Sequence, residues 1–155
     1  MPRRATRLDS RCLDARAVAE ACVLDRLVEQ GFVASLGLPP GADLVACSPG
    51  GSRVALLRIH VRDARGRYAL SAAAGSRARN RAHVFVDFPA DTLEPVCFVV
   101  PAVVVAAALG KAPGWPAGLP TAELAIYREA WHLLGLKRPG GVRSAPVSSP
   151  SSPVP

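Results

Sequence analysis

Apolar residues recur at helical spacing near the beginning of the chain. The stripe consists of Ala17, Ala21, Leu24, Leu27 and Val28. Asp14 precedes it as a candidate cap, and Gly31 follows it where helices often end on a glycine. The pattern predicts an amphipathic helix over residues 14–30.

Short apolar runs bounded by turn residues dominate the middle of the chain and predict β-strands. The runs are Phe32–Leu36, Asp43–Ser48, Arg53–Arg62, Arg67–Ser71, His83–Phe88 and Val96–Val100. A Pro-Gly-Gly turn at 49–51 separates the second run from the third and predicts a hairpin. Most neighbouring strands are therefore expected to be antiparallel.

Two further helices are expected after the strands. Residues 102–109 are apolar and follow Pro101, which the first turn of a helix tolerates. Residues 121–134 have Thr121 as a cap and an apolar stripe of Leu124, Tyr127, Trp131 and Leu134. The order of helix, strands and helices predicts an α+β fold with three layers, a central mixed sheet flanked by helices.

The periodic part of the chain forms one domain of the size expected for a single core, residues 14–136. Residues 1–13 are basic and aperiodic, which predicts a flexible arm. Residues 137–155 are rich in Ser, Pro, Gly and Val without periodicity, which predicts a disordered tail.

The charge of the chain is strongly positive, +7, and only two of the 19 basic residues are lysines. Arginine binds phosphate through two parallel hydrogen bonds, so DNA or RNA is the expected partner. The competing interpretation is that GC-rich coding alone explains the arginines. The longest apolar stretch, 96–109, is too short to span a bilayer and contains Pro101, so we expect a cytoplasmic protein without a membrane partner.

Polar residues at three places in the chain are candidates for binding a ligand or a metal ion. Along the run Arg53–Arg62, side chains alternate between faces, so Arg58, His60 and Arg62 share one face opposite an apolar one. Asp43 follows a turn, where it either caps that turn or serves as a ligand. Glu20 lies beside the apolar stripe of the first helix, so its carboxylate needs a partner, either a strand arginine or a metal ion.

The order of these motifs resembles the PD-(D/E)XK (restriction-endonuclease-like) nuclease superfamily, in particular its small resolvase-like branches. The motifs are A-E-A at 19–21, G-A-D-L-V-A at 41–46, I-H-V-R at 59–62, H-V-F-V-D-F at 83–88, C-F-V-V-P at 97–101 and Y-R-E-A-W-H-L-L at 127–134. The resemblance covers about residues 14–136 and implies a restriction-endonuclease-like sheet with flanking helices.

The resemblance also implies roles for individual residues. Asp43, Glu20 and His60 would bind Mg²⁺ or Mn²⁺, and Asp43, His60 and Arg62 would be catalytic. His60 stands where the family has Glu or Gln, and Arg62 where it has Lys. Imidazole is a poor ligand for Mg²⁺, and arginine is effectively never deprotonated, so activity stays open.

The functional expectation is thus a nucleic-acid-binding protein with a nuclease-like fold, and a metal-dependent endonuclease if it is active. The expected phosphate contacts are Arg58, Arg62, Arg77, Arg79 and Arg81, the last three from the basic S-R-A-R-N-R segment at 76–81. The alternative is a catalytically dead nuclease-like module for protein–protein assembly. A homodimer is left open.

Overall fold

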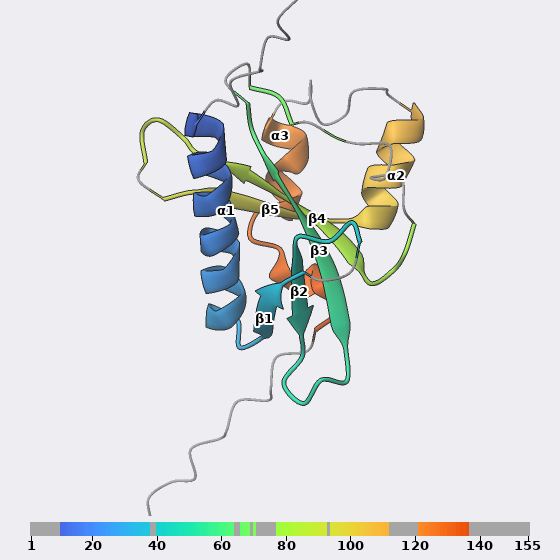
Figure 1. Ribbon diagram of the computed structural model, residues 1–155. Helices are drawn as coiled ribbons and strands as arrows, with labels where there is room; N and C mark the ends of the chain where they lie inside the picture. Colours follow the sequence, from blue (N-terminus) through green and yellow to red (C-terminus); the bar gives the residue numbers. More distant parts are fainter. Residues whose placement is uncertain are drawn as a thin grey trace, which may run out of the picture.

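Figure 1 shows the computed structural model of the chain. The structure describes residues 10–37, 40–63, 66–68, 70, 77–92, 94–111 and 121–136. The predicted tail and residues 1–9 of the predicted arm lie outside the described residues, and residues 10–13 of that arm belong to the first helix. No helix among the described residues is long and apolar enough to cross a membrane.

The first helix, α1 (Ser10–Glu29), confirms the first predicted element and begins four residues earlier. Its fully buried residues are Ala19, Val23 and Leu27, spaced four apart on one face. The predicted apolar stripe is partly wrong, since Ala17 and Ala21 are exposed. The sequence of this helix contains several overlapping apolar stripes, and the pattern alone does not distinguish the buried one. Gly31 ends the helix as predicted, with a φ of 81° and its N–H donated to the Val28 carbonyl.

Five strands form one sheet in the order β1-β2-β3-β4-β5. Their bounds are β1 Val33–Leu36, β2 Leu44–Cys47, β3 Val54–Val61, β4 Arg81–Asp87 and β5 Val96–Pro101. Only the β3–β4 pair is parallel, and the other three pairs are antiparallel. The fold is therefore α+β with a mixed sheet, as the order of elements predicts.

The predicted strand over residues 67–71 does not appear as a strand in the part of this segment that the structure describes. Asp63 and Arg67 instead close a turn, because the Asp63 N–H donates to the Arg67 carbonyl and the Arg67 N–H to Asp63 Oδ1. Tyr68 makes one isolated bridge to Arg62 and is buried edge-on against Phe85. The connection between β3 and β4 is thus a crossover that adds no strand to the sheet among its described residues.

Two clusters of buried residues cover the two faces of the sheet. The α1 face carries Leu44, Leu57, Ile59 and Val84 against the buried residues of α1. The α2 face carries Phe85, Phe98 and Val100 against Val105 of α2 (Ala102–Lys111) and Leu124 of α3 (Thr121–Leu124). Pro101 is the last residue of β5 rather than part of the helix.

The single helix predicted over 121–134 is wrong. After α3 the chain forms two 3₁₀ turns, η2 (Ala125–Tyr127) and η3 (Trp131–Leu134). Between them Arg128 is extended, and Glu129 has a φ of 49°, in the left-handed region that residues other than glycine rarely adopt. There Arg128 bridges Phe98, and the Glu129 N–H donates to the Cys97 carbonyl. β5 is an edge strand, and one side of its backbone has no neighbouring strand to bond. The hydrogen bonds that Arg128 and Glu129 make to this edge stabilise the chain more than three further residues of helix would.

Candidate carboxylate and arginine site

Asp43 lies immediately before β2 and joins it to the middle of β3. Its N–H donates to the Leu57 carbonyl at 2.8 Å, and its Oδ2 accepts the Ile59 N–H at 2.7 Å. The carboxylate therefore continues the hydrogen bonding of the ladder at the point where β2 begins and β3 extends past it. Its other oxygen, Oδ1, remains for a cation.

That cation is Arg16 of α1. Its Nη2 lies 2.7 Å from Asp43 Oδ1, its Nε lies 3.0 Å from Glu20 Oε1, and its Nη1 donates to the Ile59 carbonyl at 3.3 Å. One guanidinium thus bridges the two carboxylates that the sequence singles out, and the structure does bring Glu20 and Asp43 together. The sequence predicted either a strand arginine or a metal ion as the partner of Glu20. The observed partner is instead Arg16, an arginine of the same helix.

The oxygens around Arg16 are of the kind that Mg²⁺ prefers, two carboxylates and one backbone carbonyl. With the guanidinium among them, however, they do not fit a metal ion, since Arg16 already supplies the positive charge and fills the space. Among the described residues, no group of three or more His, Cys, Asp or Glu side chains is placed to hold a metal. The expected set of Glu20, Asp43 and His60 is not assembled.

His60 points away from the carboxylates, onto the α2 face. Its Nε2 lies 2.8 Å from Nδ1 of His83, and its ring stacks on Phe85 with centroids 4.9 Å apart. Both imidazoles are buried. Burial, and then the positive charges of His60, Arg58 and Arg81, lower the pKa of His83 to about 4, so that His83 is neutral at physiological pH.

Arg62 is held at the far end of β3. Its Nη1 pairs with Asp87 Oδ2 at 2.9 Å, and its Nε donates to the Gly66 carbonyl at 3.0 Å. These contacts tie the end of β4 to the turn after β3. The guanidinium is therefore occupied by contacts within the fold, and the structure does not direct it toward Asp43.

Arg58 and Arg81 converge on one point, and we call them the arginine pair. A Cβ atom built on Gly41 would lie 3.4 Å from Arg81 Nη1 and 3.8 Å from Arg58 Nη1. Gly41 has a φ of 78°, where glycine is favoured, so a bare backbone turn lies under both guanidinium groups. The register places Arg58 beside His83 and Arg81 beside Leu56, which brings both arginines onto the α2 face.

Neither member of the arginine pair forms an ion pair within the described part of the chain. Every ion pair found there uses other arginines, namely Arg16, Arg26, Arg62 and Arg67. Arg77 and Arg79, on the segment that leads into β4, are exposed and likewise form no ion pair with a described carboxylate. Of the five arginines predicted to contact phosphate, Arg62 is paired with Asp87, and the other four form no ion pair with a described carboxylate.

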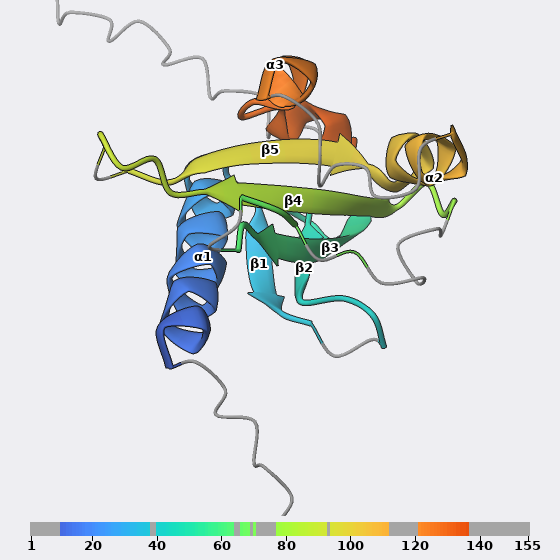
Figure 2. The same ribbon diagram turned by 90° about the horizontal axis from the view of Figure 1, so that it is seen from above.

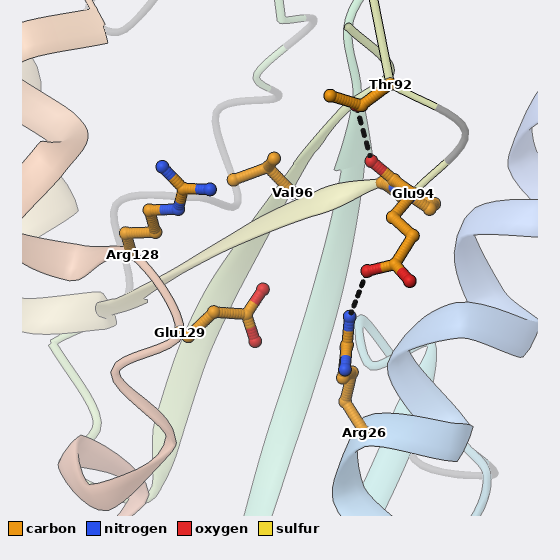
Figure 3. Close-up of a pocket in the computed structure, with 7 residues that line it drawn as sticks. Arg26, Thr92, Glu94, Val96, Arg128 and Glu129 are labelled. Atoms are coloured by element: carbon orange, nitrogen blue, oxygen red, sulfur yellow. Dashed lines mark hydrogen bonds and ion pairs between the residues drawn. The ribbon is translucent and has the colours of Figure 1, made fainter.

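A pocket of about 370 Å³ lies elsewhere, between α1, the start of β5 and the segment before η3 (Figure 3). In it Arg26 pairs with Glu94, and the carboxylate of Glu129 points toward α1. That carboxylate accepts the Cys97 N–H and the Trp131 indole N–H. The acidic and basic groups of the pocket are balanced, and none of the predicted site residues lines it.

Sequence reasoning missed two members of the site. Arg16 is four residues before Glu20, and this spacing alone indicates an ion pair on a helix. His83 lies on β4, which is between β3 and β5 in the sheet. No local pattern could reveal its pairing with His60, because the parallel register of β3 and β4 brings the two together.

Comparison with known proteins adds no relative. No protein family model, no curated protein and no solved structure matches the chain. The resemblance to the PD-(D/E)XK nucleases therefore stays a prediction from the motifs.

Proposed function

We propose that this protein binds nucleic acid through a phosphate held by the arginine pair, and that it does so without metal-dependent cleavage. The observation that carries the proposal is the convergence of Arg58 and Arg81 over Gly41 without a described carboxylate between them. Two like charges held near one point repel each other unless an anion joins them. We also propose, from the resemblance of the motifs, that the fold is of the restriction-endonuclease-like type.

A phosphate diester suits the spacing of the arginine pair. Because both distances are measured from one point, the two Nη1 atoms lie within about 7 Å of each other, and phosphate oxygens accepting charge-assisted bonds on each side can span this gap. Arg77 and Arg79 extend the positive surface along the segment before β4. A row of phosphates fits such a row of arginines better than a single small anion does.

Arg16 is the reason for expecting binding without cleavage. A metal ion in a nuclease activates water and stabilises the charge that develops on the phosphate. The guanidinium between Glu20 and Asp43 cannot activate water as a metal ion does. His60, paired with His83 inside the α2 face, lies away from the carboxylates and offers no replacement base there.

The test is fluorescence anisotropy with a labelled DNA duplex, a single-stranded DNA and a single-stranded RNA, titrated with the full chain at several salt concentrations. In the variant Arg58→Gln/Arg81→Gln we expect affinity for the preferred probe to fall at least about tenfold. The salt slope of log K should flatten by about 1 if that probe is the duplex, since about one counterion is released for each phosphate neutralised and the arginine pair holds one phosphate.

The matched control is Arg26→Gln/Arg67→Gln, which removes the same charge from arginines that already have acidic partners. It should keep the slope close to that of the wild type. Equal losses in the two variants would mean that only net charge matters. Absence of binding by the wild type at low salt would refute the proposed function and favour coding bias as the origin of the arginines.

A further inference from the structure

The helices of the described residues cover only part of the width of the α2 face of the sheet. α2 contacts β4 and β5, and in both views it lies away from β1 and β2 (Figures 1 and 2). On β1, β2 and β3 this face presents a set of apolar side chains that we call the open sheet face. Its members are Val33, Val45, Cys47, Val54 and Leu56.

The open sheet face is contiguous and accessible. The register aligns Val33 with Cys47 and Val54 in one row, and Val45 with Leu56 in the next, where Ser35 is the partner on β1. Val33 is 64% exposed and Val54 is 42% exposed, whereas the other three are half-buried. An antiparallel sheet with one face in water normally carries polar side chains on that face, so an apolar one indicates a contact surface.

The dimensions of the open sheet face suit one helix. Three strands about 4.8 Å apart and about four residues long at 3.3 Å per residue form a patch slightly wider than the 10 Å diameter of a helix. The opposite face of the same strands is already closed by α1. One further helix on the open sheet face would complete the second layer over this half of the sheet.

The charge at the border of the patch determines the kind of helix. Leu56 is in register with Arg81, and Arg58 is the next residue of β3 on the same face, so the arginine pair borders the apolar rows. Neither arginine has an acidic partner among the described residues. A helix that lies on the patch therefore gains most if it presents Asp or Glu at this border.

Two other occupants fit less well. A second copy of the chain, docked face to face through the same patch, would bring two arginine pairs together in a protein whose net charge is already +7. Nucleic-acid bases bind through stacking on aromatic rings, and the five residues of the patch are aliphatic or thiol side chains.

We propose that the open sheet face binds an amphipathic helix of a partner protein, with the apolar side of the helix on Val33, Val54 and Leu56 and its carboxylates against Arg58 and Arg81. This interaction goes beyond nucleic-acid binding. It is tested in the absence of nucleic acid, so that failure of one proposal is distinguishable from failure of the other.

The probes are two stapled peptides of about three helical turns, with identical leucines at positions i, i+3, i+4 and i+7. One peptide carries glutamates at the remaining positions and the other carries lysines. Titration calorimetry with the full chain should show the glutamate peptide binding at least about tenfold more tightly than the lysine peptide. The variant Arg81→Glu should remove this preference, because the new carboxylate lies beside Arg58 and cancels its charge.

The variant Val33→Lys/Val54→Lys should abolish binding of the glutamate peptide. Both side chains are exposed, so the fold tolerates the change, and a thermal melt checks this. The matched control is Val18→Lys/Val28→Lys, which places the same residues on exposed positions of α1 and should leave the affinity within about twofold.

Equal binding of the two peptides, or undiminished binding to Val33→Lys/Val54→Lys, would overturn the proposal. A dimer in sedimentation equilibrium that Val33→Lys/Val54→Lys dissociates would identify a second copy as the occupant instead. Loss of oligonucleotide affinity in this variant, despite its two added positive charges, would assign the patch to nucleic acid.

Discussion

The buried histidine pair makes the stability of this fold depend on pH. His83 is 4% exposed, contacts His60 at 2.8 Å and has the arginine pair nearby, so a proton on its ring is opposed by burial and then by neighbouring positive charge. Its pKa is lowered to about 4 in the folded protein. In the unfolded chain a histidine titrates near 6.5, roughly.

The sign follows from where the proton binds. Below about pH 6.5 the unfolded chain takes up a proton that folded His83 takes up only near pH 4, so acid stabilises the unfolded state. The contribution of His83 to stability is complete above pH 6.5 and decreases as the pH falls toward 4. At pH 5 the loss is about 2 kcal/mol, because pH 5 lies about 1.5 units below the unfolded pKa and above the folded one, at about 1.4 kcal/mol per unit.

The assay is urea unfolding at pH 7.5 and pH 5 for the wild type and for His83→Asn. The Asn side chain places a polar atom near the position of Nδ1, so it keeps the contact with His60 and cannot take up the proton. The wild type should lose about 2 kcal/mol more than His83→Asn between the two pH values. His132→Asn, at an exposed position, is the control and should behave as the wild type does. The same pH dependence in wild type and His83→Asn would refute this reasoning.

Three further substitutions test other parts of the structure. Arg16→Ala removes the guanidinium between the two carboxylates and should create Mn²⁺ binding that calorimetry does not find in the wild type, at a cost of about 1 kcal/mol in urea unfolding because the ion pairs are partly exposed. Glu129→Ala leaves the Trp131 indole N–H without its acceptor and should lower the free energy of unfolding by about 2 kcal/mol in the same assay. Gly41→Ala strains a backbone with a φ of 78° and presses on Arg81, so a thermal melt should show a loss of about 1 kcal/mol, with weaker oligonucleotide binding by anisotropy.

Local patterns predicted the elements whose formation depends on nearby residues. α1 and its glycine end, the five strands and the Pro-Gly-Gly hairpin follow from periodicity and turn residues. The alternation along β3 was also correct, because Ile59 is buried on the α1 face and His60 on the α2 face. The class of fold was therefore readable from the order of elements.

Features that depend on contacts between distant segments could not be predicted from the sequence. The segment 121–134 has a helical pattern, but the open edge of β5 draws Arg128 and Glu129 out of the helix. The pairing of Arg62 with Asp87 depends on the parallel register of β3 and β4. The position of Arg16 over Asp43 depends on the packing of α1 on the sheet, which no spacing along the chain specifies.

The most direct test of the account is a single titration of a labelled oligonucleotide with the wild-type chain, in EDTA and again in Mn²⁺, followed by a gel of the recovered probe. The account predicts the same affinity in both buffers and an intact probe, because the arginine pair binds phosphate and Arg16 keeps the carboxylates from a metal. Binding that requires Mn²⁺, or cleavage that Mn²⁺ supports and Asp43→Ala abolishes, would contradict it.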